Sequence, residues 1–144
     1  MALHLVKLCV GAESVADLAD WIERRLAERR RQKLPAEHIH VTRMVPKRAE
    51  ELLDGGSLYW VIHGVVQVRQ RLVAVRPVID RAGTRRCHLV LDPELVATAP
   101  QPRAPFQGWR YLKEADAPHD LAALGAAAGL PPHLAQELRT LGLL

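Results

Sequence analysis

The stretch VVQVRQRLVAVRPVIDRAGTRRCHLVL, residues 65–91, carries the clearest fold signal in this chain. From Val65 to Val75 polar and apolar residues alternate, which is the period of a strand with two different faces. A turn-forming segment with a glycine follows at residues 80–84, and residues 85–91 alternate again. Two alternating segments around such a turn predict an antiparallel β-hairpin.

The first strand of this hairpin has one polar and one apolar face. Gln67, Arg69 and Arg71 share the polar face. The opposite face holds Gln70 among apolar neighbours, and an unpaired buried amide costs about 1–3 kcal/mol, so this side chain needs partners in the core. In the second strand the inward positions include Cys87, which we expect to be a small core residue. The apolar face is predicted to carry Val66, Val68, Gln70, Leu72 and Ala74.

Other elements are predicted on both sides of the hairpin. Ser14 followed by Asp17 is a capping-box start, and apolar residues at helical spacing then predict a helix over about 14–32. Four segments are predicted as strands (3–10, 39–43, 57–63 and 109–112), with the almost wholly apolar 57–63 covered on both faces. The remaining predictions are a short helix over 47–54, an extended proline-rich loop over 92–108, and helices over about 120–128 and 132–141.

Together these elements predict an α+β fold in a single chain of 144 residues and 16.0 kDa. We expect residues 1–113 to form a small antiparallel, barrel-like sheet with two packed helices. Residues 114–144, rich in Ala and Leu, are expected to form a helical C-terminal tail packed on that domain. The apolar content of 49% is enough for a core of ordinary size.

Several protein classes are excluded by composition and pattern. Cys9 and Cys87 have no metal-binding, redox or disulfide-framework spacing, which favours a cytoplasmic setting. The N-terminal residues do not read as a secretory signal, and the chain has no long apolar run, so no membrane is expected as a partner.

Positive charge is concentrated in two segments. The net charge is +4, and 16 of the 20 basic residues are arginine. Residues 21–48 and 65–113 each carry a net charge of +6, whereas residues 114–144 carry −3. Half of the six aromatic residues fall within residues 106–111, inside the second basic segment. Arginines with aromatic planes are what recognition of single-stranded nucleic acid requires, whereas a solvated basic face is the alternative.

This pattern predicts RNA, or a nucleotide, as the partner. The arginines would contact phosphate or base edges, Gln67 and Gln107 would act as amide readers, and Trp109, Phe106 or Tyr111 would stack on bases. The predicted nucleic-acid-binding residues are Arg43, Gln67, Arg69, Arg71, Arg103, Gln107, Trp109 and Arg110.

Two other functions stay open from sequence. An enzyme acting on a modified base or nucleoside would draw on the polar residues Gln70, Arg43, Asp92 and Glu50, but no nucleophile or acid–base pair is recognisable, so an enzyme is the less favoured hypothesis. A protein-interaction module would use the tail, which could also join two copies of the chain.

Neither a metal nor a cofactor is predicted. His38 and His40 are two apart and could point the same way, but a zinc site needs three or four ligands. We therefore expect the histidines to lie at the surface or half-buried.

Four motifs carry a resemblance to a known family. HVTRM (40–44), RAEELLDGGSLYWVI (48–62), VRQR (68–71) and PFQGWRYL (105–112) occur in this order and resemble a small uncharacterised bacterial family, a domain of unknown function of about this length. That resemblance implies no activity.

A second, fainter resemblance concerns the order of elements. A short helix ending in glycine, then a strand, a bend and a basic strand, is similar to the opening of PUA and ASCH domains, small barrels that bind RNA or modified nucleotides. It implies a PUA-like β-barrel for residues 1–113. Leu58 and Val61 stand where the ASCH pattern has Lys and Glu, so an ASCH-type hydrolytic activity is not implied.

Overall fold

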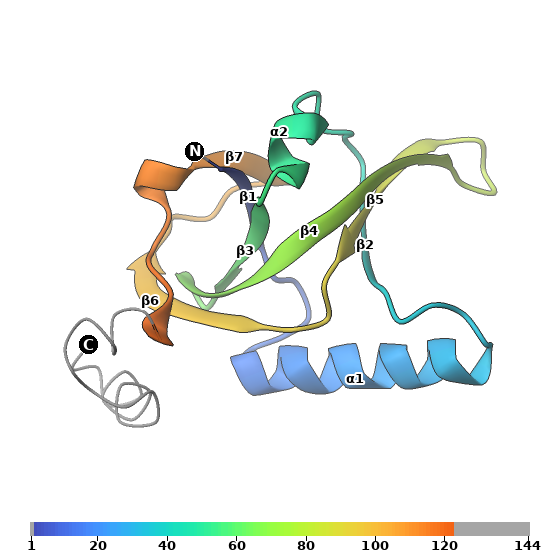
Figure 1. The fold of residues 1–144 in the computed structure, drawn as a ribbon, viewed down its shortest axis with the longest axis horizontal. Helices are drawn as coiled ribbons and strands as arrows, with labels where there is room; N and C mark the ends of the chain where they lie inside the picture. The colour runs from blue at the N-terminus through green and yellow to red at the C-terminus, as the bar shows by residue number, and fades with distance from the viewer. Residues whose placement is uncertain (1, 123–144) are drawn as a thin grey trace.

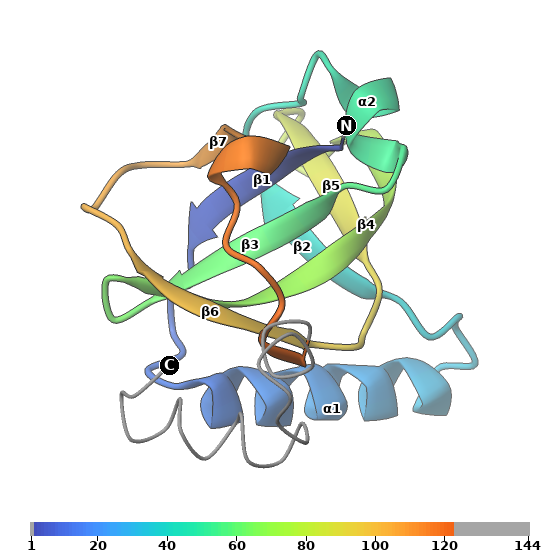
Figure 2. The same ribbon diagram turned by 60° about the vertical axis from the view of Figure 1, so that its left-hand side comes forward.

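The computed structural model describes residues 2–122 as a seven-stranded sheet with two helices (Figure 1). α1 crosses one end of the sheet and α2 lies at the opposite end, as Figures 1 and 2 both show. The α+β class is therefore confirmed. The predicted tail helices, over about 120–128 and 132–141, lie outside the described residues from residue 123 on. The elements are β1 (Leu3–Leu8), α1 (Val15–Arg31), β2 (His38–Thr42), α2 (Ala49–Leu53), β3 (Ser57–Ile62), β4 (Val65–Ile79), β5 (Arg85–Leu91), β6 (Val96–Pro102), β7 (Trp109–Lys113) and a 3-10 turn η1 (Glu114–Asp116).

The sheet is assembled on β4. This strand pairs with β3 along one edge. Along its other edge it pairs first with β6, through residues 65–69, and then with β5, through residues 72–79. The β4–β5 hairpin is the predicted one, with β4 running beyond its predicted end. Only His63 and Gly64 connect β3 to β4, and their φ angles of 51° and 73° fit the tight turn that suits twisted antiparallel strands.

The sheet is mixed, so the expectation of an antiparallel sheet is wrong in one place. β1 lies between β3 and β7, parallel to β3 and antiparallel to β7. Parallel neighbours need a long connection, and here α1, β2 and α2 supply it. Residue alternation alone carries no information on strand direction. The strand order β2-β5-β4-β3-β1-β7 leaves β2 and β7 as edges, which no backbone pairing joins within the described residues.

β6 replaces part of the loop that was expected over residues 92–108. It contains Pro100 and Pro102. Proline has no backbone N–H to donate, so it is disfavoured in a strand that is paired along both edges. The strand tolerates them because β4 pairs with one side of it, while the other side makes only an isolated bridge between Thr98 and Asp120.

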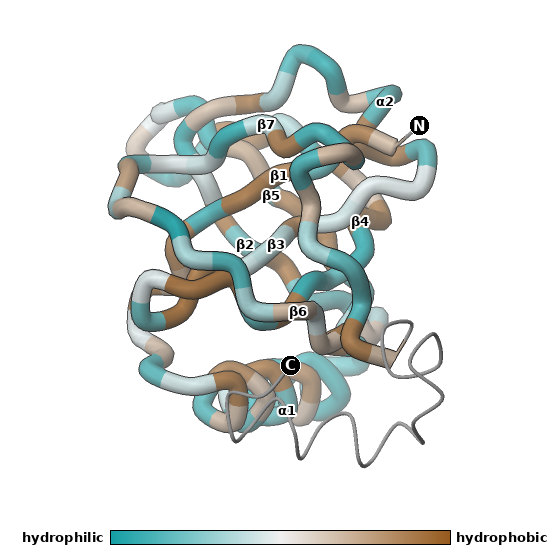
Figure 3. Tube along the Cα trace, turned by 90° about the vertical axis from the view of Figure 1, so that its left-hand side faces the viewer, coloured by the Kyte–Doolittle hydropathy of each residue, from teal (hydrophilic) through white to brown (hydrophobic). Residues whose placement is uncertain are grey.

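Two hydrophobic clusters occupy the two faces of β1 and β3. The larger is covered by α1, through Leu18 and Ile22, and the smaller lies on the opposite face. Figure 3 shows hydrophobic segments within the strands and on α1, with hydrophilic segments along the outer connections. All of β3 is buried, as predicted. The larger cluster includes Leu5, Leu58, Trp60, Leu72, Cys87 and Leu89, and the smaller consists of Val6, Tyr59, Val61, Val66 and Leu112.

A bulge changes the facing of one predicted core residue. The pairing of β4 with its neighbours shifts between Val66 and Val68. Val66 therefore packs in the smaller cluster, whereas Val68 packs in the larger one, although strict alternation placed them on the same face.

The start of α1 follows the predicted capping pattern. Ser14 Oγ accepts a hydrogen bond from the Asp17 N–H at 3.0 Å, and the Asp17 carboxylate accepts one from the Glu13 N–H at 3.2 Å. The helix ends with three arginines, residues 29–31, whose charge suits the negative end of the helix dipole. Among residues 2–122, the helices are too short or too polar to cross a membrane.

We predict that Gly56→Ala strongly destabilises the fold. A Cβ at this position would lie 2.2 Å from the Leu52 carbonyl oxygen and 2.3 Å from that of Leu3, so α2 and β1 would have to separate. We expect a loss of about 3 kcal/mol or more in the free energy of unfolding, measured by urea denaturation. Gly83→Ala is the control: it has the strained φ of +80° but open space around it, so about 1 kcal/mol is expected. Equal losses in the two variants would contradict the steric argument.

Candidate functional site

A buried polar chain crosses the larger cluster at Gln70. Its side-chain oxygen accepts a hydrogen bond from Trp60 Nε1 at 2.9 Å. Its amide nitrogen donates to the Asp92 carbonyl oxygen at 2.9 Å, and His38 Nδ1 lies 3.0 Å from that nitrogen and 3.2 Å from the side-chain oxygen. The prediction that this fully buried amide finds partners is confirmed.

His38 and His40 project from β2 into this core. His38 meets Trp21 edge to face at 5.6 Å between ring centroids, and His40 meets Trp60 at 5.0 Å. Burial lowers the pKa of each imidazole to about 4, so both are neutral at neutral pH. The expectation of surface or half-buried histidines is wrong for His38, and also for His4, because both side chains are packed in the protein.

The Nε2 atoms of His38 and His40 have no hydrogen-bond partner in the structure. Within the described part of the chain, no set of three or more His, Cys, Asp or Glu side chains is arranged to hold a metal ion. The two imidazoles pack edge to face against two tryptophans.

A groove lies where the edges β2 and β7 approach each other. We call it the seam groove; its volume is about 620 Å³. It brings together three of the predicted nucleic-acid-binding residues, Arg43, Gln107 and Trp109, with a fourth polar residue, Lys7, that sequence reasoning missed. The complete lining is Lys7, Val41, Thr42, Arg43, Met44, Gln107, Gly108 and Trp109.

The two cationic side chains of the seam groove and its glutamine are unpaired among the described residues, whereas the Thr42 hydroxyl donates to the Met44 carbonyl oxygen. Lys7, Arg43 and Gln107 make no side-chain hydrogen bond or ion pair with the residues that the structure describes. Lys7 is half-buried on the inward side of β1, and burial lowers the pKa of its ammonium group. The sequence holds a partial signal for Lys7. It lies on the same face of the strand as Leu3 and Leu5, where an apolar residue is expected.

The aromatic wall of the groove is held in place from both edges. Trp109 is the cross-strand partner of Lys7, and its Nε1 donates to the Met44 carbonyl oxygen at 3.0 Å. Tyr111 lies next to Trp109 at 5.0 Å between ring centroids, and its hydroxyl accepts from the Arg48 N–H at 3.2 Å. The Arg48 guanidinium lies 5.5 Å from the Tyr111 ring centroid. Side chains of β7 thus contact the segment that follows the edge strand β2.

The other predicted residues do not line this groove. Arg110 faces the smaller cluster and stacks on Phe106 at 5.2 Å, because successive residues of β7 point to opposite faces. Arg103 lies 3.4 Å from the Gln101 amide oxygen, and Arg71 is exposed. Gln67 donates to the Ile62 carbonyl oxygen at 3.1 Å.

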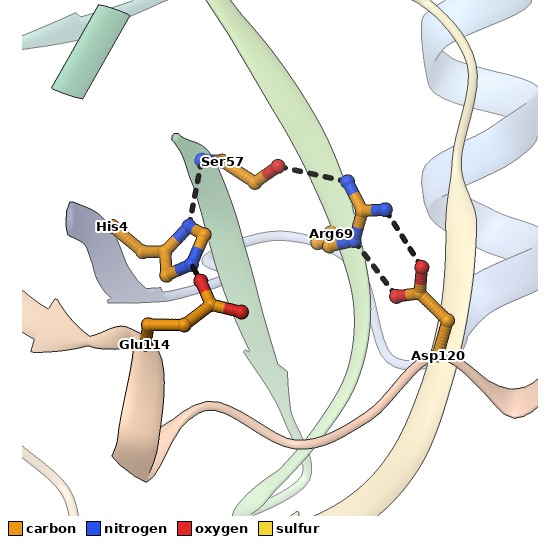
Figure 4. A network of polar contacts seen from close by, with 5 residues as sticks. All are labelled: His4, Ser57, Arg69, Glu114 and Asp120. Carbon is orange, nitrogen blue, oxygen red and sulfur yellow. Dashed lines mark hydrogen bonds and ion pairs between the residues drawn. The ribbon is translucent and has the colours of Figure 1, made fainter. Parts of the chain in front are cut away.

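Arg69 is engaged in a second site. Its Nε and Nη2 each lie 2.8 Å from a carboxylate oxygen of Asp120, and Nη1 donates to Ser57 Oγ at 2.9 Å. Beside them, His4 contacts Glu114 and accepts a hydrogen bond from the Ser57 N–H at 3.0 Å (Figure 4). These five residues line a pocket of about 520 Å³, which we call the network pocket.

The charged groups in the network pocket shift one another's pKa values. The hydrogen bonds from Arg69 lower the pKa of the Asp120 carboxyl, and the same contact raises the pKa of Arg69. Burial raises the pKa of the Tyr59 hydroxyl, which also lines the pocket, to about 12.

Sequence reasoning found only Arg69 among the members of this pocket. His4 and Ser57 meet because β1 and β3 are parallel neighbours, and Glu114 and Asp120 come from the segment that crosses the sheet after β7. No local pattern marks such a meeting. The residues proposed from sequence for an enzyme do not form a site. Gln70 is buried and donates a hydrogen bond to the Asp92 carbonyl oxygen, and Glu50 is exposed on α2.

Comparison with known proteins identifies a family whose function is unknown. Residues 5–144 match the family described as "Protein of unknown function (DUF1489)". No curated protein matches the chain, and no solved structure does.

We predict that acid destabilises the fold through the buried histidines. The pKa values of His38 and His40 are about 4 in the folded chain, against an ordinary value of 6.5. Between these values the unfolded chain binds more protons, so the free energy of unfolding falls as pH drops from about 6.5 towards 4. The slope is up to ~1.4 kcal/mol per pH unit for each histidine. Urea denaturation across this pH range measures it.

The variant His40→Phe keeps a ring against Trp60 and removes one titrating group, so its stability should depend less steeply on pH. His88→Gln is the control. His88 is half-buried on β5, and the variant should keep the wild-type dependence of stability on pH. Identical slopes for wild type and His40→Phe would show that this imidazole does not set the acid response.

Proposed function

The chain belongs to the DUF1489 family of proteins of unknown function, and from its own surface we propose that it binds single-stranded nucleic acid, RNA foremost, in the seam groove. The phosphates would be held by Lys7 and Arg43. Bases would stack on Trp109 and Tyr111, with Gln107 as an amide reader of base edges.

Lys7 is the observation that carries the proposal. Its ammonium group is half-buried, and no carboxylate of the described chain pairs with it. Desolvating a charge without a counterion is unfavourable, as the lowered pKa of Lys7 reflects. A phosphate in the groove would supply that counterion, and Arg43 on the opposite wall would add a second positive charge.

The surroundings of Lys7 favour a nucleic acid over a simple anion. None of the eight residues that line the groove is acidic, so an anionic chain meets no repulsion there. Trp109 and Tyr111 form an aromatic pair, and the Arg48 guanidinium beside Tyr111 is ion-paired with Glu51. Stacking of a base on an aromatic ring contributes about 1–3 kcal/mol whatever the base, which suits a binder of single strands.

A PUA-like barrel is part of the same proposal. It is supported by the contacts of Trp109 with Met44 and of Tyr111 with Arg48, which join β7 to the segment that follows β2. These side-chain contacts bring the sheet edges together without a backbone ladder. An enzyme acting on a modified base gains no such support, because the groove places no carboxylate beside Arg43.

We predict that the protein binds a labelled oligouridine of about ten nucleotides, measured by fluorescence anisotropy. The affinity should fall steeply between about 50 and 200 mM salt, because binding releases counterions from the phosphates. Lys7→Gln and Arg43→Gln should each weaken binding and reduce the salt slope by about 0.7, the value for one phosphate contact on a single strand. Trp109→Leu should weaken binding about tenfold at every salt concentration, because it removes a stacking plane.

Arg81→Gln is the matched control. This exposed arginine lies in the β4–β5 turn, outside the groove, and is unpaired among the described residues, so its loss should leave the affinity within about twofold of wild type. Equal losses for Arg81→Gln and Lys7→Gln would mean diffuse charge attraction and refute the groove. Absence of binding at low salt would refute nucleic-acid binding altogether.

A further inference from the structure

The network pocket is a second built site, separate from the seam groove. It lies on the other face of β1, since successive residues of that strand face opposite sides and His4 lines one site while Lys7 lines the other. Its volume of about 520 Å³ is within the range of small-molecule sites. Residues from β1, β3 and β4 form its floor, and the segment after β7 crosses over it (Figure 4).

His4 cannot neutralise an acid in this pocket or act as a base. The Ser57 N–H donates to its Nδ1, so that nitrogen carries a lone pair and the ring is neutral. The proton is therefore on Nε2 and is donated to Glu114. Both ring nitrogens are occupied, and the ring adds no charge.

Arg69 and Asp120 balance each other. Two parallel hydrogen bonds of 2.8 Å join them, which is the two-pronged geometry of a strong arginine–carboxylate pair. A third bond fixes the guanidinium to Ser57. The charge of Arg69 is thus already matched, and Glu114 remains as a carboxylate that no cation of the described chain pairs with.

Tyr59 supplies an independent sign of a ligand. The residue is only 4% exposed, yet its hydroxyl makes no hydrogen bond to any residue the structure describes. It lines the pocket, and Arg69, Glu114 and Asp120 are the charges that act on it. Because this hydroxyl lines the pocket and bonds to none of the described residues, it is available to a molecule bound there.

We propose that the network pocket binds a small organic cation carrying a primary ammonium group. The free oxygen of Glu114 and the hydroxyl oxygen of Tyr59 would accept two of the three ammonium hydrogens. The charge of the ligand would add to a wall that holds two carboxylates, one guanidinium and the exposed imidazole of His119. An anion is disfavoured, because Asp120 already occupies Arg69. This inference stands whether or not the seam groove binds RNA.

The test compares three probes of similar shape and different charge: propylamine, 1-propanol and propionate. Each is titrated into the full chain while backbone amide signals are followed by NMR. We expect propylamine to give saturable shifts at the amides of Ser57, Arg69 and Asp120, and 1-propanol to give none. Tighter binding of propionate than of propylamine would overturn the proposal, and so would equal binding of the amine and the alcohol.

Two variants remove the two acceptors without removing packing. Glu114→Gln keeps an oxygen for His4 and loses only the charge, and it should weaken propylamine binding about tenfold or more. Tyr59→Phe loses only the hydroxyl and should weaken binding about fivefold. Glu94→Gln, an exposed carboxylate outside the pocket, should bind as wild type does. Wild-type affinity in Glu114→Gln, or an equal loss in Glu94→Gln, would refute the site.

Discussion

The pairing of both edges of β4 is the constraint on which the rest of the structure depends. Residues 65–69 lie between two neighbouring strands, so their N–H and C=O groups need partners on both edges, whereas residues 72–79 pair along one edge. β3 satisfies one edge, and β6 and β5 share the other in succession. That division sends the chain from β5 back along the same strand as β6, despite the prolines in β6.

Gln70 shows how closely the core is tied to this strand. It stands near the middle of β4 and links β3 through Trp60, β2 through His38, and the turn after β5 through the Asp92 carbonyl oxygen. One amide thereby satisfies polar groups from three other parts of the chain. An apolar residue in its place would leave those buried groups without partners, so the polar centre of this core specifies its arrangement.

β1 places two different surfaces on its two faces. His4 faces the network pocket, and Lys7 faces the seam groove. The two sites differ in charge because different segments surround them. Carboxylates from the segment after β7 line the network pocket. Residues after β2 and before β7, none of them acidic, line the seam groove. The net charges of the sequence segments could not show this contrast between the two faces. The groove combines Arg43 and Trp109, from the two basic segments, with Lys7 from residues 1–20, whose net charge is −2.

The arginines of residues 65–113 divide in the same way. Arg69, Arg76 and Arg86 are ion-paired, with Asp120, Glu37 and Asp80 respectively. A basic total therefore overstates the free positive surface. An arginine on the polar face of a strand looks the same in sequence whether its partner is a phosphate or a distant aspartate, and Asp120 is 51 residues away from Arg69.

What the sequence determined by itself is local. Alternation located the strands, spacing and the Ser14 cap located α1, and the inward position of Gln70 indicated a paired buried amide, since each of these signals lies within a few neighbouring residues. The tertiary structure decided the direction of β1, the strand character of β6 and the meeting of His4 with Glu114, 110 residues apart. These depend on which distant segments satisfy each other's backbone and charge, and no local period records that choice.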